Sequence, residues 1–360
     1  MIQGFIRLIL IRNVEDNDMK ILCTLEKGET RDIYFPPSVF QKLNGLGKVV
    51  WNEFERPLTS HELAELIPGT DICLTHWECP VFNEEVLAHA DRLKMIAHAA
   101  GSVADFITEK VYDRGIIVCS ANKVMAKSVA EGALADILAG LRLIPQQAYE
   151  LKYGKKWDKK VRESRDLAGA KIGMIGLGTV GRNLIDLLVP FHPMIRVYDP
   201  YLNPESLQKW NLDIQPASLD EVLQWGNIIT LHASLTRETR GMLNAEKLSL
   251  IGNHALLVNT ARSGIIDTEA LTAELASGRL NAVLDVFDTE PLPDDSPLRS
   301  FDNVILLPHV AGITAKEQMT FAMLDEIDRF INGKPLEYEI PRQVFERMTQ
   351  EHLPDLAKRS

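Results

Sequence analysis

Short apolar runs alternate with amphipathic stretches along most of this chain. Runs typical of buried strands occupy five segments of the first third and six segments further on: 20–25, 48–52, 71–75, 93–97 and 116–120, then 171–175, 196–199, 227–232, 255–260, 282–286 and 303–307. Stretches with helical spacing of apolar residues separate most of these runs. Strands that alternate with helices are typical of parallel sheets covered on both faces, so the pattern predicts an α/β fold.

Helices are predicted between the strands, the clearest of them at 84–89, 106–114, 219–225, 245–251, 268–277 and 315–331. Thr59 and Glu62 form a capping-box pattern at the start of a further short helix. A longer helix is predicted over 127–144, ended by Pro145, with apolar residues at helical spacing and many small residues. Such a helix packs inside a core or against a second copy of the chain, and the sequence leaves both interpretations open.

A glycine-rich turn follows the run 171–175. Gly176 suits a tight turn, Gly178 allows backbone to approach a pyrophosphate, and Gly181 allows a helix to pack closely on its strand. Asp199 ends the next strand, where a carboxylate binds the ribose hydroxyls of NAD and repels a 2'-phosphate. The spacing therefore predicts an NAD site, which includes the first residues of the helix, Thr179 and Val180.

The position of this turn, in the middle of the chain, predicts a separate domain before it. We expect a substrate domain formed by residues 19–122 and 311–360, and an NAD-binding domain formed by residues 123–310. Two crossings of the chain between the domains would make a hinge with a cleft. Residues 1–18 are an extension whose role the sequence does not define.

Composition and charge narrow the class of protein. The 360 residues carry a net charge of −11, which disfavours nucleic acid as a ligand. The four cysteines have no metal-ligand spacing, so we predict no metal site and a reduced, cytoplasmic protein. The apolar residues 1–11 are too few to span a bilayer and show no clear cleavage site, which disfavours membrane insertion and secretion.

Three predicted strand ends of the second half carry polar side chains with a shared chemistry. His309 can exchange a proton with a substrate hydroxyl near neutral pH. Glu290 can orient the imidazole ring of His309, and Arg262 can bind a substrate carboxylate and polarise the neighbouring carbonyl group. These three groups meet the needs of hydride transfer between NAD and a 2-hydroxy acid.

The chain resembles the D-isomer-specific 2-hydroxyacid dehydrogenases from about residue 20 to residue 336. The resemblance rests on 176–181, 231–239, 259–267, 284–292 and 308–312. It implies a flavodoxin-like substrate domain, a Rossmann NAD-binding domain and a homodimer built around the long helix. It implies that Arg262, Glu290 and His309 are catalytic. Asp199 would hold the adenosine ribose and Asp285 the nicotinamide carboxamide, and the matching segments add three more cofactor residues, His232, Thr260 and Ala261.

The substrate is predicted to be a small 2-hydroxy or 2-keto acid. In the family, the loop that matches Ala100, Gly101 and Ser102 offers backbone N–H groups to the substrate carboxylate. Trp77 follows another predicted strand and favours an apolar or bulky substrate side chain. Ala233 stands where relatives commonly have Pro, and Ser263 where they commonly have Gly, and both changes leave NAD binding possible.

A binding protein is the main alternative to an enzyme. The C-terminal binding proteins, which are NAD-sensing transcriptional corepressors, share the same fold and catalytic residues. Such proteins carry long disordered tails, and this chain has no long tail rich in Ser, Pro and Gly. An enzyme of the same fold that has lost its activity is disfavoured because all three catalytic side chains are present.

Overall fold

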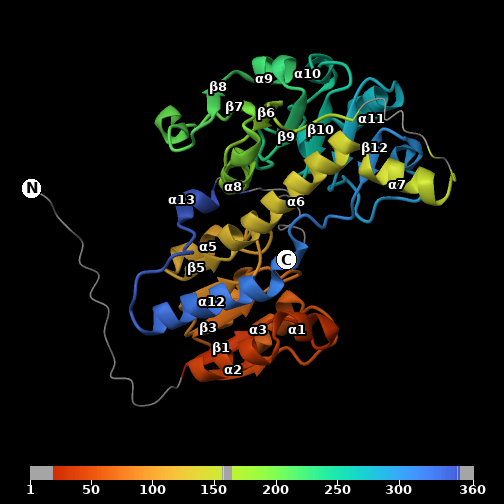
Figure 1. Cartoon of the computed structure of the whole chain (residues 1–360). Helices are drawn as coiled ribbons and strands as arrows, with labels where there is room; N and C mark the ends of the chain where they lie inside the picture. Colours follow the sequence, from red (N-terminus) through yellow and green to blue (C-terminus); the bar gives the residue numbers. More distant parts are fainter. Residues whose placement is uncertain (1–18, 156, 158–163, 347, 349–360) are drawn as a thin grey trace, which may run out of the picture. The chain divides into compact units, whose positions relative to one another are not determined.

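The structure, a computed structural model, describes residues 19–155, 157, 164–346 and 348 (Figure 1). The predicted extension, 1–18, lies outside the described residues. The chain divides into two compact units. The first unit contains the described residues up to Met125 and those from Ala315 onward, and the second unit contains residues 126–314. No helix of the described residues combines the length and the apolar character needed to cross a membrane.

The first unit is built around a five-stranded parallel sheet. The strands are β1 (Lys20–Cys23), β2 (Lys48–Trp51), β3 (Ile72–Thr75), β4 (Met95–His98) and β5 (Ile117–Ser120). Their order in the sheet is β2-β1-β3-β4-β5, which is the flavodoxin-like order. The predicted fold class of the first domain is therefore confirmed.

Helices cover both faces of this sheet. On one face, Ile21 and Leu74 of the strands are buried with Met323 of α12. On the other face, Cys73 and Ile96 are buried with residues of α3 and α4. The helices of this unit are α1 (Glu29–Tyr34), α2 (Pro37–Leu46), α3 (Ser60–Leu66), α4 (Glu84–His89), α5 (Glu109–Asp113), α12 (Lys316–Ile331) and α13 (Arg342–Phe345). Thr59 and Glu62 form the predicted capping box of α3.

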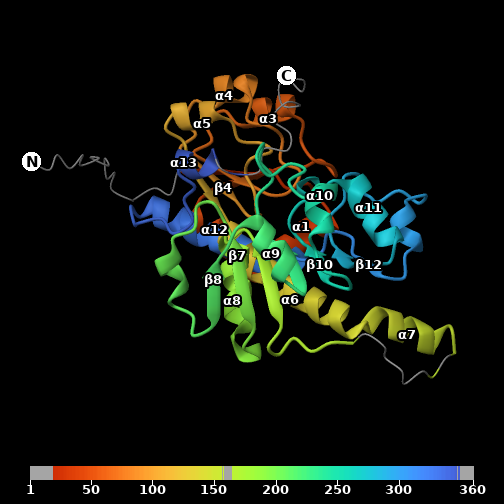
Figure 2. The same ribbon diagram turned by 90° about the horizontal axis from the view of Figure 1, so that it is seen from above.

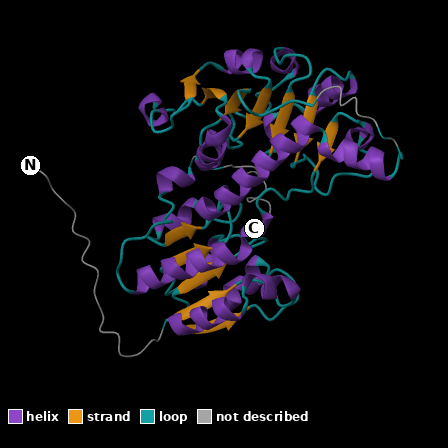
Figure 3. Ribbon diagram, viewed as in Figure 1, coloured by secondary structure: helices purple, strands orange, loops and turns teal. Residues whose placement is uncertain are grey.

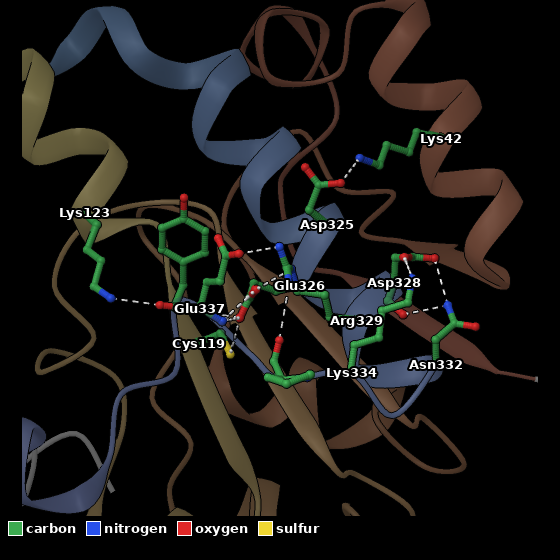
Figure 4. Close-up of polar contacts among 12 residues, drawn as sticks. Lys42, Cys119, Lys123, Asp325, Glu326, Asp328, Arg329, Asn332, Lys334 and Glu337 are labelled. Atoms are coloured by element: carbon green, nitrogen blue, oxygen red, sulfur yellow. Dashed lines mark hydrogen bonds and ion pairs between the residues drawn. The ribbon is translucent and has the colours of Figure 1, made fainter. Parts of the chain in front are cut away.

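A buried carboxylate ties α12 to the segment that follows it (Figure 4). Glu326 is fully buried and accepts hydrogen bonds from the backbone N–H groups of Glu337, at 3.0 and 3.1 Å, and of Tyr338, at 3.0 Å. Arg329 lies 3.5 Å from the same carboxylate. Ser120 of β5 then donates its N–H to the Tyr338 carbonyl. These bonds explain why the C-terminal part of the chain belongs to the first unit.

The second unit contains a seven-stranded parallel sheet. Its strands are β6 (Lys171–Ile175), β7 (Met194–Tyr198), β8 (Asp213–Pro216), β9 (Ile228–Leu231), β10 (Leu256–Asn259), β11 (Asn281–Leu284) and β12 (Val304–Leu306). The order is β12-β11-β10-β9-β6-β7-β8. Read from β8, the first six strands have the Rossmann order, 3-2-1-4-5-6 in this unit's own numbering. The predicted Rossmann fold is confirmed.

Two helical layers enclose the second sheet (Figure 3). The helices are α6 (Asn122–Arg142), α7 (Ile144–Lys152), α8 (Thr179–Leu188), α9 (Leu219–Trp225), α10 (Ala245–Ser249) and α11 (Thr268–Ala276). Ile137 of α6 and Leu184 of α8 are buried with Val258 and Val283 on one face of the sheet. On the other face, α9, α10 and α11 pack against the alternate residues of the strands.

The long helix differs from the prediction in both of its ends. The helix α6 begins at Asn122, and Pro145 lies at the start of a second helix, α7, because proline is compatible with the first turn of a helix (Figure 2). Val124 and Met125 pack in the first unit and Ala126 begins the second. The division between the units therefore falls inside α6, a few residues after the predicted boundary at 122/123.

Candidate active site

The glycine turn after β6 has the geometry that its sequence predicts. Gly176 has a φ of +86°, and a Cβ atom there would lie 2.6 Å from the backbone nitrogen of Ala233. A Cβ atom at Gly181 would lie 3.0 Å from the carbonyl oxygen of Gly176, so the first turn of α8 packs tightly on the loop. At Gly178 the nearest atom to such a Cβ is 4.0 Å away. The turn leaves open space in front of the first N–H groups of α8, which suits a pyrophosphate.

Asp199 is held against this turn from the end of β7. One carboxylate oxygen accepts the N–H of Leu177 at 2.7 Å, and the other accepts the N–H of Tyr201 at 2.8 Å. A carboxylate has about four acceptor positions, so both oxygens retain capacity for the two hydroxyls of a ribose. The donor and acceptor groups of the turn and of Asp199 therefore fit NAD.

His232 follows β9 and borders the same turn. Its N–H binds the Ile175 carbonyl at 2.7 Å, and its ring Nε2 lies 3.0 Å from the hydroxyl of Thr230. Burial lowers the pKa of His232 to about 4, so the ring is neutral at neutral pH. A neutral ring can donate or accept one hydrogen bond without placing a cation beside a nicotinamide.

The segment after β10 is braced by the buried side chain of Asn259. The Asn259 amide accepts the N–H of Ala261 at 3.0 Å and donates to the carbonyl of Arg262 at 3.0 Å. The Arg262 guanidinium donates to the Ala261 carbonyl at 2.8 Å, so part of this side chain is already oriented. The buried hydroxyl of Thr260 has no hydrogen-bond partner within the described part of the chain.

His309 and Glu290 form the hydrogen-bonded pair expected for an acid–base catalyst. The distance from Nδ1 of His309 to a carboxylate oxygen of Glu290 is 2.8 Å. The second oxygen of Glu290 accepts the N–H of Phe287 at 2.9 Å, which fixes the carboxylate. His309 has a φ of 55°, and half of its side chain is exposed. Glu290 therefore orients the ring and leaves Nε2 available for a reacting group.

Asp285 has a role that the sequence did not predict. This fully buried carboxylate follows β11 and accepts the N–H groups of Val310, at 2.8 Å, and Ala311, at 2.9 Å, one on each oxygen. These two residues follow His309 directly. Asp285 therefore fixes the backbone that carries the His309 imidazole.

The loop of Ala100, Gly101 and Ser102 lies in the first unit, after β4. The hydroxyl of Ser120 donates to the carbonyls of Ala100 and Gly101. The N–H groups of these three loop residues donate to no other group in the described ranges. A Cβ atom at Gly101 would lie 3.3 Å from the Trp77 ring, which packs on the loop and is 45% exposed. The loop therefore offers unpaired amides and a neighbouring aromatic face.

Two buried histidines beside this loop were not singled out from the sequence. His98 ends β4 and His76 follows β3, and both are essentially inaccessible to solvent. Nδ1 of His98 lies 3.0 Å from the Thr75 hydroxyl, whereas Nε2 of His98 and both ring nitrogens of His76 have no partner among the described residues. Burial lowers the pKa of His98 to about 3, and the pKa of His76 falls in the same direction. Their position at strand ends was the available sequence signal.

The structure thus distributes the predicted site residues over the two units. The second unit contains Arg262, Glu290 and His309 together with every predicted cofactor residue. The first unit contains the predicted substrate residues Trp77, Ala100, Gly101 and Ser102.

Comparison with known proteins identifies the family. A sequence profile described as "D-isomer specific 2-hydroxyacid dehydrogenase, NAD binding domain" matches residues 134–311. The chain is 34% identical to a hydroxypyruvate reductase of Thermotoga maritima, over 75% of this chain and 89% of that protein. It is 34% identical to a D-3-phosphoglycerate dehydrogenase of Methanocaldococcus jannaschii, over 77% of this chain and 53% of that protein. The chain thus spans about half the length of the phosphoglycerate dehydrogenases that it matches.

Solved structures give the same result. A protein from Thermus thermophilus superposes with a TM-score of 0.74 at 28% identity and covers 90% of this chain and 100% of its own. An acyclic imino acid reductase, solved with NADPH and D-Arg, superposes with a TM-score of 0.74 at 25% identity, over 90% of this chain and 100% of its own. The chain belongs to the D-isomer-specific 2-hydroxyacid dehydrogenase family and contains that family's NAD-binding domain.

Proposed function

We propose that the protein is an NAD-dependent oxidoreductase that interconverts a D-2-hydroxy acid and the corresponding 2-keto acid. The single observation that carries this proposal is the hydrogen-bonded pair of Glu290 and His309, in the same unit as Arg262 and the glycine turn. Family membership supports the same chemistry. The hydroxypyruvate and glyoxylate reductases among the relatives are named for reactions of this kind.

The cofactor residues follow from the turn and from Asp199. We infer that the N–H groups of Thr179 and Val180 hold the pyrophosphate over Gly178, and that Asp199 binds the adenosine ribose. His232, Thr260, Ala261 and Asp285 lie at the carboxyl ends of neighbouring strands and are assigned to the nicotinamide half. Held there, the cofactor would supply the hydride acceptor for oxidation at C2 of the hydroxy acid and the hydride donor for reduction of the keto acid.

Side chains of the second unit transfer the proton of the substrate hydroxyl and bind the negative charge of the substrate carboxylate. In the oxidation direction, Nε2 of His309 takes the proton of the substrate hydroxyl, and Glu290 stabilises the imidazolium that forms. In the reduction direction, the same nitrogen donates a proton to the carbonyl oxygen. Arg262 binds the substrate carboxylate and polarises the carbonyl group, since a guanidinium suits planar carboxylates.

The first unit supplies the other substrate contacts. We assign the unpaired amides of Ala100, Gly101 and Ser102 to the substrate carboxylate, and the exposed face of Trp77 to the substrate side chain. These contacts favour a small 2-keto acid with an apolar side chain.

We also propose a homodimer, for which α7 offers an association surface in addition to the predicted one around the long helix. The apolar residues of α6 that pack in the second unit, such as Ala133 and Ile137, are buried there and are not available to a partner. By contrast, α7 buries none of its residues and exposes Ile144, Tyr149 and Leu151, each by more than half. Exposed apolar side chains at this density favour an association surface on α7. We place the enzyme in the cytoplasm, in keeping with its free cysteines, three of them buried.

A panel of 2-keto acids tests the proposed function. NADH oxidation should be measured with glyoxylate, hydroxypyruvate, pyruvate, 2-ketoisocaproate and phenylpyruvate, and repeated with NADPH. We expect turnover with at least one acid and a preference for NADH that weakens in Asp199→Ala. NADH binding without turnover of any acid would refute the enzyme and favour a cofactor-sensing binding protein.

A further inference from the structure

A second buried carboxyl group lies behind the segment that carries His309. Asp136 of α6 is only 7% exposed, and its neighbours on the helix, Ala133 and Ile137, are buried with Val258 and Val283. Side chains alternate between the two faces along a strand, so Thr260 and Asp285 point to the same face of the sheet as those two valines. The helix and the strand ends thus enclose a buried polar layer beneath the apolar one.

Asp136 is not neutralised in this layer by any group that the structure describes. Its Oδ2 atom has no hydrogen-bond partner, and no described cation pairs with the side chain. Burial, followed by the charge of Asp285, raises the pKa of Asp136 to about 7. Burial and a nearby negative charge both favour the protonated form of a carboxyl group. Asp136 has both, and its Oδ2 accepts no hydrogen bond from the described residues, whereas Asp285 accepts two backbone N–H groups.

The same layer holds the backbone of the catalytic segment. Asp285 binds the N–H groups of Val310 and Ala311, and a Cβ atom at Gly132, one turn before Asp136 on α6, would lie 2.8 Å from the Ala311 carbonyl oxygen. The residues after His309 are therefore fixed between α6 and Asp285. Any change in the position of Asp285 is transmitted to the backbone of His309.

We propose that Asp136 is a positioning residue whose protonated form keeps Asp285 on the amides of Val310 and Ala311, and so keeps His309 in its catalytic position. Loss of the Asp136 proton places a second negative charge beside Asp285 and weakens this contact. Among the charged groups of the described residues, Asp285 is the one that raises the pKa of Asp136. The ring of His309 is paired with Glu290. The consequence for turnover rests on the proposed function.

The two reaction directions separate this effect from the proton of His309 itself. Keto-acid reduction needs His309 with its proton, and hydroxy-acid oxidation needs it without, so an effect through the acid–base role of His309 has opposite signs in the two directions. Ionisation of Asp136 disturbs the position of His309 and impairs both directions. An alkaline loss that appears in both directions is therefore assigned to Asp136.

The test compares the wild type with Asp136→Asn, which keeps the shape of the side chain and cannot ionise. The ratio of kcat/KM, variant over wild type, should be near 1 at about pH 6 and should rise about tenfold by about pH 9, in both directions. Asp166→Asn is the matched control, because Asp166 is an exposed residue paired with Arg142 in the same unit. Its ratio to the wild type should stay constant over this range. A constant ratio for Asp136→Asn, or a rise in the reduction direction alone, would overturn the proposal.

A readout without turnover keeps the inference separate from the proposed function. In the wild type, a ¹³C carboxyl resonance that is absent from Asp136→Asn should titrate near neutral pH. The imidazole resonance that is lost in His309→Gln should shift over the same range, and this shift should disappear in Asp136→Asn. If no keto acid is turned over, the proposed function fails. The two resonances still show whether the ionisation of Asp136 affects the imidazole of His309. The proposal would be contradicted if the imidazole resonance of His309 did not shift over the pH range in which Asp136 titrates.

Discussion

The carboxyl ends of the two sheets differ in how their polar groups are satisfied. In the second unit, Asp199, Asp285 and Glu290 each accept backbone N–H groups, and His309 is oriented by Glu290. In the first unit, both ring nitrogens of His76, one of His98 and three successive loop amides lack partners among the described residues. The difference shows that internal hydrogen bonds fix the carboxylates of the second unit before any ligand binds. In the described part of the first unit the corresponding groups lack such bonds, and both histidine rings are closed off from solvent.

The largest effect should come from removing the oriented imidazole of the second unit. His309→Ala should lower kcat about a thousandfold, the usual scale for loss of a general acid–base. NADH affinity should change little, because no hydrogen bond of the glycine turn or of Asp199 involves His309. Stopped-flow or steady-state rates and NADH fluorescence titration measure the two quantities. Retention of more than about a tenth of the wild-type kcat would remove His309 from the acid–base role.

The buried histidines of the first unit should make the folded protein less stable at low pH. The pKa of His98 is about 3 in the folded protein, whereas an unfolded histidine titrates near 6.5. The unfolded state therefore binds more protons below about pH 6.5, and stability falls as the pH falls from there toward 3. Between pH 7.5 and pH 5 the free energy of unfolding should fall by about 2 kcal/mol less in His98→Phe than in the wild type, as measured by urea denaturation.

His89→Phe provides the control for this measurement, because His89 is an exposed histidine at the end of α4 in the same unit. It should lose stability on acidification as the wild type does. Equal acid sensitivity of wild type and His98→Phe would show that the ring of His98 is not held neutral in the folded state.

A smaller effect should separate the structural and the ligand-binding glycines of the turn. Gly178→Ala should leave the melting temperature nearly unchanged, since φ is −72° and the nearest atom is 4.0 Å from the new Cβ. NADH affinity should fall about tenfold, because the methyl group occupies the space assigned to the pyrophosphate. Gly176→Ala should instead destabilise the fold by about 1–2 kcal/mol or more, since its φ is +86° and Ala233 blocks the Cβ. Unchanged NADH affinity in Gly178→Ala would place the pyrophosphate elsewhere.

Most strands and the glycine turn could be predicted from the sequence because they leave local signals. Buried parallel strands are apolar throughout, and the glycine turn has fixed spacing. The edge strand β8 was missed because three of its four residues are exposed and leave no apolar run. The start of α7 was missed because a proline marks both the end of one helix and the first turn of the next.

The parts of the site that could not be predicted depend on contacts between distant residues. Asp136 and Asp285 lie on different elements, far apart in the sequence, and only the packing of α6 on the sheet brings their charges together. Asp285 also accepts two backbone N–H groups, and no sequence motif indicates that it does so. Local patterns report which residues have catalytic chemistry, whereas the packed structure reports what holds them in place.

The chirality of the product tests the central claim most directly. A 2-keto acid that the wild type reduces to a chiral product should be converted with NADH, and the hydroxy acid analysed by chiral chromatography. The account predicts the D enantiomer alone, with product formation lost in His309→Ala. An L or racemic product, or undiminished formation by His309→Ala, would contradict it.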